Sequence, residues 1–158
     1  MSHVIRVWFA CLAIAAGMVA GCGSESPDGS ERLRAANPSN IHRLTNLYSM
    51  FSLQNRGRSP KDEKEFRAFI LAMGPERLGR MGIKTDAIDG LFTSERDSQP
   101  FTILYGSDAG GSRSQDKGGL AVVMESKGAA GKRQVGFLGT RSTREVKELD
   151  EAQMPNLK

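Results

Sequence analysis

Residues 40–55 read Asn-Ile-His-Arg-Leu-Thr-Asn-Leu-Tyr-Ser-Met-Phe-Ser-Leu-Gln-Asn, and this stretch decides the fold class. Its large apolar side chains recur at intervals of three and four residues, which places them on one stripe of an α-helix. The stripe consists of Ile41, Leu44, Leu47, Tyr48 and Phe51, with Met50 and Leu53 as further candidates, while Arg43, Asn46 and Gln54 lie toward the other side. The pattern predicts an amphipathic helix whose apolar face covers a core.

Both ends of this helix carry sequence signals. Pro38 excludes helix before it, and Ser39 or Asn40 can accept hydrogen bonds from the free N–H groups of the first turn. At the other end, Asn55-Arg56-Gly57 contains a glycine that can adopt the left-handed conformation in which many helices end. The sequence therefore predicts one helix over residues 40–55.

A second helix is predicted to begin at Ser59-Pro60-Lys61-Asp62. Ser59 is a capping residue, Pro60 suits the first helical position, and Asp62 supplies a carboxylate three residues after the cap. The buried face of this helix is expected to consist of Phe66, Phe69, Ile70 and Met73, and Gly74-Pro75 ends it.

The remaining chain changes from helical to extended patterns. A short helical turn is predicted over residues 76–81, and irregular chain with Ile83, Ile88, Leu91 and Phe92 covers the core. Apolar runs predict strands at residues 101–105, 120–124 and 134–138, the last two joined by a hairpin connection at residues 127–132. Ser142-Thr143-Arg144-Glu145 resembles a capping box and predicts a short helix with Val146 and Leu149 facing inward. The expected fold class is α+β, with an N-terminal amphipathic helix pair packed on a three-stranded antiparallel sheet and a short C-terminal helix.

The N-terminus carries the pattern of an exported lipoprotein. Arg6 precedes an uncharged apolar run from Val7 to Ala20, which is shorter than the roughly 20 residues needed to span a bilayer. The small-residue motif Val19-Ala20-Gly21 followed by Cys22 predicts cleavage before Cys22 and attachment of fatty-acyl chains such as palmitate to its thiol. An uncleaved membrane anchor is the alternative interpretation.

These features predict three parts: a signal peptide over residues 1–21, the lipidated Cys22 with a flexible tether over residues 22–39, and one α+β domain over residues 40–158. The tether is rich in Gly, Ser, Pro, Asp and Glu, so it cannot bury enough apolar surface to fold. The expected location is the cell-envelope membrane. Gly23 lacks the aspartate associated with inner-membrane retention in some bacteria, which favours the outer membrane.

Two segments of the domain resemble the soluble part of the pseudopilins of type II secretion, over about residues 40–140. Leu47-Tyr48 lies on an amphipathic helix like theirs, and Asn55-Arg56-Gly57-Arg58-Ser59-Pro60 looks like their following turn with one residue inserted. Arg96-Asp97-Ser98-Gln99-Pro100-Phe101 is similar to the D-x-W-G-N-P-Y segment that leads into their first strand. The resemblance implies a pilin-like fold. The whole chain also looks like small bacterial lipoproteins that share these two segments.

The N-terminus departs from the pseudopilin pattern. It lacks the cleaved glycine, the methylated phenylalanine and the glutamate that pseudopilins use in fibre assembly. An apolar segment that is removed cannot serve as a retained assembly helix, so the resemblance supports the fold more than the function.

The sequence offers few groups for catalysis. Once Cys11 is removed and Cys22 is acylated, no thiol remains, and His42 is the one histidine of the mature chain. A Cys–His pair is therefore excluded and a zinc site is disfavoured. His42 is expected to be structural or solvent-facing. Carboxylates cluster at Asp62-Glu63-Glu65, at Asp86 and Asp89, and at Glu145, Glu148, Asp150 and Glu151, the last set being expected on the ion-paired face of the C-terminal helix.

Two glycine-rich segments remain as candidate binding loops. Asp108 and Asp116 in the loop over residues 106–118 are weak candidates for calcium, because they lack the usual spacing of calcium ligands. A mobile surface loop is the competing interpretation. Gly128-Ala129-Ala130-Gly131 joins strands rather than helices, so it does not predict an RNA clamp, and no nucleic acid is expected as a partner.

Three hypotheses for function follow from these observations. The first is a lipid-anchored, non-enzymatic envelope protein that acts as an interaction or structural module, with a protein partner in the envelope and no cofactor. The second is an accessory component of a secretion or pilus-like apparatus. The third is an envelope hydrolase that uses paired carboxylates.

Overall fold

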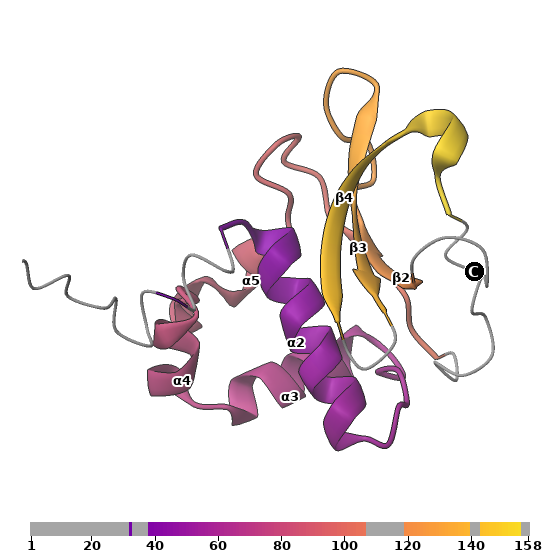
Figure 1. Ribbon diagram of the computed structural model, residues 1–158. Coiled ribbons are helices and arrows are strands. Elements are labelled where there is room, and N and C mark those ends of the chain that lie inside the picture. The colour runs from indigo at the N-terminus through magenta and orange to yellow at the C-terminus, as the bar shows by residue number, and fades with distance from the viewer. Residues whose placement is uncertain (1–31, 33–37, 107–118, 140–142, 156–158) are drawn as a thin grey trace, which may run out of the picture.

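The computed structural model describes residues 32, 38–106, 119–139 and 143–155. The predicted signal peptide, Cys22, nearly all of the tether, Asp108 and Asp116 lie outside these residues. The described chain is a mixed helical and β structure with an antiparallel sheet (Figure 1). Its elements are α2 (Asn40–Gln54), α3 (Glu63–Ala72), α4 (Pro75–Arg80), η1 (Thr85–Ala87), α5 (Ile88–Leu91), β1 (Thr102–Ile103), β2 (Leu120–Met124), β3 (Lys132–Leu138), β4 (Arg144–Asp150) and η3 (Glu151–Gln153).

The helix predicted over residues 40–55 is confirmed as α2. Ser39 has the extended backbone of an N-cap, and Gly57 closes the C-terminal end with φ 86° and an N–H bonded to the Ser52 carbonyl at 2.8 Å. The five core members of the predicted stripe are all buried. Two predictions about its margins are wrong, because Leu53 is 63% exposed and Asn46 is buried against the sheet.

The second helix begins three residues later than predicted. Asp62 is its N-cap, and the carboxylate of Asp62 accepts a hydrogen bond from the Glu65 N–H at 2.7 Å. Ser59 and Pro60 instead lie in buried non-helical chain, where the Pro60 carbonyl accepts the Gly106 N–H at 2.8 Å. This tertiary contact holds Ser59 and Pro60 outside α3, so Asp62 caps the helix instead of Ser59.

The segment over residues 75–92 is more regular than predicted. The helical turn predicted at residues 76–81 is confirmed as α4, which Pro75 begins. The chain after it was expected to be irregular but contains η1 and α5. Its apolar residues Ile83, Ile88, Leu91 and Phe92 are buried in the main core, as expected.

Within the described residues the sheet has four antiparallel strands in the order β1-β2-β3-β4, rather than three. The strand predicted at residues 101–105 is limited to Thr102 and Ile103, which pair with Met124 and Val123. The predicted hairpin between β2 and β3 is confirmed. It turns at Ala129–Lys132, where Ala130 and Gly131 both have positive φ, 53° and 74°, as in a type I′ turn.

The predicted C-terminal helix is wrong, because this segment is strand β4. Seven of its residues pair in continuous register with β3, from Lys132↔Asp150 to Leu138↔Arg144. Val146 packs on the main core and Leu149 on a second cluster, so the two residues lie on opposite faces instead of one helical face. A ladder of this length satisfies more backbone groups than a short helix that is only marginally stable by itself.

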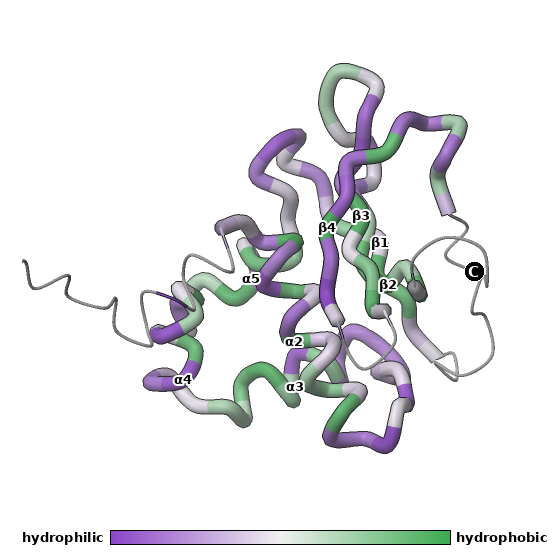
Figure 2. The backbone as a smooth tube through the Cα atoms, viewed as in Figure 1, coloured by the Kyte–Doolittle hydropathy of each residue, from purple (hydrophilic) through white to green (hydrophobic). Residues whose placement is uncertain are grey.

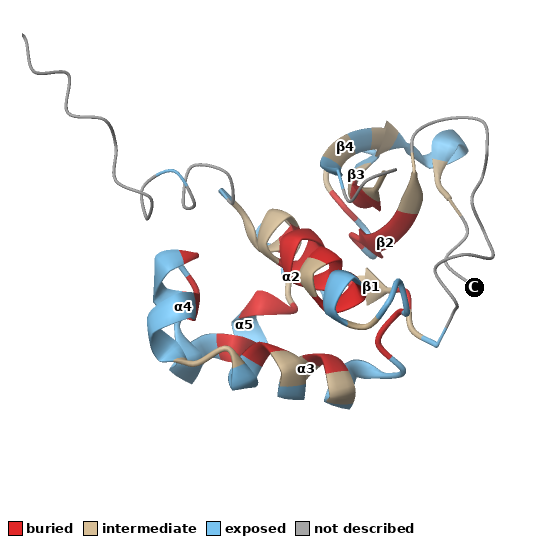
Figure 3. Ribbon diagram, turned by 60° about the horizontal axis from the view of Figure 1, so that its bottom comes forward, coloured by how far each residue is buried: buried red, intermediate tan, exposed pale blue. Residues whose placement is uncertain are grey.

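Three layers build the domain, with α2 between the sheet and the remaining helices (Figure 3). The prediction of a helix pair on the sheet is therefore only half right: α2 packs on β2, β3 and β4, whereas α3 packs on α2. The aromatic rings of Tyr48, Phe51 and Phe66 meet edge to face between the two helices. This interface and the sheet face under α2 form the main core.

The opposite face of the sheet carries a second apolar cluster. Ala121, Met124, Val135 and Phe137 form it, and Leu149 and Met154 pack against it. None of the helices in the described part of the chain is both long and apolar enough to cross a bilayer.

Candidate functional site

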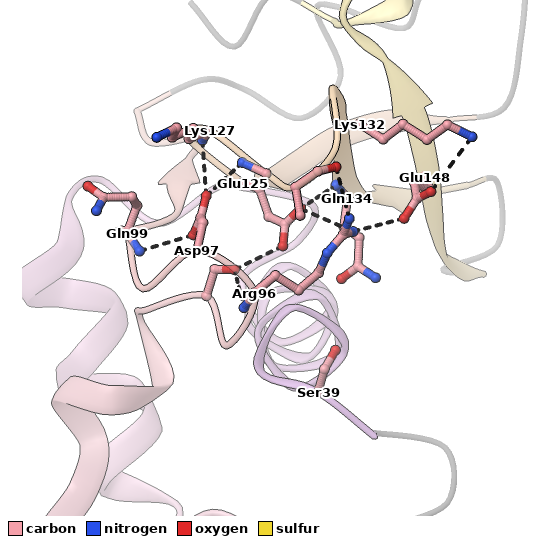
Figure 4. Close-up of polar contacts among 12 residues, drawn as sticks. Ser39, Arg96, Asp97, Gln99, Glu125, Lys127, Lys132, Gln134 and Glu148 are labelled. Atoms are coloured by element: carbon pink, nitrogen blue, oxygen red, sulfur yellow. Dashed lines mark hydrogen bonds and ion pairs between the residues drawn. The ribbon is translucent and has the colours of Figure 1, made fainter.

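A polar network at one end of the sheet joins stretches of chain that are distant in sequence (Figure 4). It connects the loop over residues 94–99, the chain just after β2, the start of β3 and the middle of β4. Its charged members are Arg96, Asp97, Glu125, Lys132 and Glu148.

Glu125 is the one buried charged residue within the described part of the chain, at 1% exposure. Each of its carboxylate oxygens has a partner. The Ser94 hydroxyl donates to Oε1 at 2.9 Å, and the Gln134 N–H donates to Oε2 at 2.7 Å. Because a buried carboxylate without partners costs several kcal/mol, these contacts are needed to keep Glu125 in place.

Arg96 lies between two carboxylates. Its Nη1 atom is 2.9 Å from Glu148 Oε2 and 3.4 Å from Glu125 Oε2. Lys132 adds a more distant positive charge, with Nζ 3.9 Å from Glu148 Oε1. One guanidinium therefore ties the loop over residues 94–99 to the end of β2 and to strand β4.

Asp97 fixes the same loop to the β2–β3 hairpin. Its carboxylate accepts the N–H groups of Gln99 at 3.0 Å and Gly128 at 2.6 Å, with Lys127 N–H at 3.3 Å. Burial acts to raise the pKa of Asp97, but these N–H groups together lower it below its ordinary value. Between Asp97 and Gln99, Ser98 adopts a left-handed backbone with φ 55°.

This geometry suits a clamp better than an acid–base pair. Proton transfer to a substrate needs a carboxyl group within reach of that substrate. Here Glu125 is buried, and the guanidinium of Arg96 occupies the space between Glu125 and Glu148. The network holds the loop, the hairpin and β4 in one arrangement.

His42 lies apart from this network, in the first turn of α2. Its Nδ1 atom is 2.8 Å from the Ser39 hydroxyl oxygen. Burial lowers the pKa of His42, and the nearby Glu95 carboxylate acts in the opposite direction. The contact is local to the helix start.

The other predicted carboxylate clusters serve as caps and ion-pair partners. Glu63 and Asp89, from two separate clusters, meet at Arg67 with N–O distances of 2.6 and 2.7 Å. The last cluster lies on strand β4 and the 3-10 helix η3 rather than on the predicted C-terminal helix. Its members pair as Glu145 with Lys147, Glu148 with Arg96, and Glu151 with Arg133, while the Asp150 side chain caps η3.

Within the described part of the chain, no group of three or more His, Cys, Asp or Glu side chains is placed to hold a metal ion. The calcium candidates Asp108 and Asp116, the lipidation site Cys22 and the cleavage motif Val19-Ala20-Gly21 fall outside the described residues.

Sequence reasoning missed Glu125 and Arg96 as partners. One signal was available, because Glu125 directly follows the apolar run of β2, where an acidic residue has to be exposed or paired. Its partner lies 29 residues earlier in the chain, and no spacing rule connects the two.

Comparison with known proteins gives no match, either to a protein-family model, to a curated protein or to a solved structure.

Proposed function

We propose that this protein is a lipid-anchored, non-enzymatic module of the bacterial cell envelope that acts by binding other proteins. The observation that carries the proposal is the motif Val19-Ala20-Gly21-Cys22 at the end of an uncharged apolar run. Small residues before a cysteine suit cleavage and acylation, and two or three acyl chains provide stable anchoring where one chain does not. The predicted location is the outer membrane.

Two observations on the folded domain support the proposal, one on its non-enzymatic character and one on its likeness to pseudopilins. Its polar network clamps three stretches of chain and leaves the buried carboxylate without access to a substrate. The segment that resembles the pseudopilin D-x-W-G-N-P-Y sequence also has a fitting backbone. Ser98 stands two residues before Pro100, where that segment has its glycine, and has φ 55°, a conformation that glycine adopts easily.

Metabolic labelling with an acyl-chain probe tests the anchor directly. Cys22→Ser should abolish labelling and move the protein from the detergent phase to the aqueous phase, while the circular dichroism spectrum of the domain stays unchanged. Cys11→Ser is the matched control, because Cys11 lies within the predicted signal peptide, and it should leave labelling intact. Unchanged partitioning of the Cys22→Ser protein would refute the proposal.

A further inference from the structure

Strand β4 forms an open edge of the sheet. It pairs with β3 on one side, and no other described strand pairs with it. In Figure 2 it is mostly hydrophilic, in contrast to β2. Exposed edges present unpaired N–H and C=O groups and thus invite a further strand. We propose that two copies of this chain pair through β4 in antiparallel orientation.

The hydrogen bonds of β3 show which groups of β4 face the open edge. The Gln134 carbonyl accepts the N–H of Glu125 on the β2 side, so the backbone groups of its neighbours Arg133 and Val135 point to β4. The residues opposite these neighbours, Leu149 and Lys147, bond back to β3. The backbone groups of Arg144, Val146 and Glu148 therefore point outward and set the register in which a second strand can bind.

One self-pairing register matches four of the five charges on the strand with their opposites, and Asp150 has no charged residue opposite it. With Val146 opposite Val146 of the second copy, Glu145 stands opposite Lys147 and Arg144 stands opposite Glu148, each pair occurring twice by symmetry. Residues that stand directly opposite share one face of a sheet, so their side chains can meet. The same register aligns the outward backbone groups at positions 144, 146 and 148 for mutual hydrogen bonding.

Neighbouring registers are disfavoured by like charges. The next register that keeps side chains on the correct faces brings Lys147 against Lys147 and retains one kind of opposite-charge contact, Arg144 with Asp150. One step further, Glu148 stands against Glu148. Like charges directly opposite each other destabilise a strand pair. The charges of β4 thus favour the register with Val146 opposite Val146, which has four opposite-charge contacts and no like-charge contact within the strand.

The surrounding structure is compatible with this dimer. The symmetry axis stands perpendicular to the sheet, so both α2 helices lie on the same side of a combined eight-stranded sheet. Val146 is half-buried at the centre, and Glu145 and Lys147 are at the surface on the opposite face from α2. An interface of one short strand per copy is small, and we expect a dissociation constant of about 1–100 µM.

Sedimentation of the purified full-length chain, in detergent if it is extracted from membranes, tests the proposal with charge reversals. Glu145→Lys and Lys147→Glu each create two like-charge contacts and should weaken the dimer about tenfold or more. The double variant restores opposite charges and should recover wild-type association. Lys84→Glu changes the net charge as Lys147→Glu does, but on the helical side, and should leave association unchanged.

Thermal melts of each variant check that the fold survives, since the exposed pair between Lys147 and Glu145 is worth little to the monomer. A monomeric wild type, or single variants that associate as the wild type does, would overturn the inference. So would a double variant that fails to recover. The inference does not depend on the lipid anchor: loss of the dimer with intact acyl labelling separates it from the proposed function.

Discussion

Replacing Gly136 by alanine tests a close approach between α2 and the sheet. A Cβ atom at this position would lie 1.9 Å from Thr45 Oγ1 and 3.1 Å from Thr45 Cβ. Thr45 is 1% exposed, and its hydroxyl donates to the Ile41 carbonyl at 2.7 Å, so the side chain cannot rotate without losing this bond. Overpacking costs about 1–3 kcal/mol and the lost hydrogen bond about 1 kcal/mol, so we expect a loss of about 2–4 kcal/mol.

Urea unfolding followed by circular dichroism measures this loss, and a double variant identifies its cause. Thr45→Ala removes the clashing hydroxyl, so Gly136→Ala should cost at least about 1 kcal/mol less in that background. Gly79→Ala is the matched control, because a Cβ there meets nothing within 4 Å, and in a helix it should stabilise by about 0.5–1 kcal/mol. A Gly136→Ala midpoint equal to that of the wild type, or additive effects in the double variant, would refute the reasoning.

Three further predictions concern the clamp, the hairpin and a capping carboxylate. Arg96→Ala should cost about 3–5 kcal/mol in urea unfolding, because it leaves the buried carboxylate of Glu125 without its positive partner. Ala130→Asn should raise the free energy of unfolding measured in urea by about 0.5–1 kcal/mol, since asparagine tolerates the positive φ that a type I′ turn requires. The hydrogen bond from Arg58, followed by that from a backbone N–H, lowers the pKa of Glu65 from 4.5 to about 2. Its contribution to stability is therefore present above about pH 4.5 and is lost as the pH falls toward 2; carbon-detected NMR titration with a midpoint near 4.5 would contradict this.

The residue pattern alone was sufficient for elements whose stability is local. The apolar stripe of α2 has a helical period, and one such stripe has to be buried wherever the helix packs. The β2–β3 hairpin is likewise predicted by two apolar runs with glycines between them. In both cases the residues that decide the structure are neighbours in the chain, so their spacing carries the information.

Whether residues 144–150 form a strand or a helix depended on a partner strand. Their sequence contains a helix-start signal and mixed charges, and it lacks a clear alternation of apolar and polar residues. These residues form a strand because they pair with β3, and this pairing satisfies the backbone hydrogen-bonding groups on that side of β3. The displaced start of α3 has a similar cause, the contact between Pro60 and Gly106.

The sequence by itself determined the mixed α+β class, the buried face of α2, the hairpin and a cysteine motif typical of lipid attachment. Only the tertiary structure decided that a further strand, β4, joins the edge of the sheet at β3, that α2 separates the sheet from the other helices, and that Arg96 meets Glu125 and Glu148. The physical reason is the distance along the chain over which each interaction acts. Periodicity and capping involve residues a few positions apart, whereas strand pairing and the burial of a charge depend on groups that only the folded chain brings together.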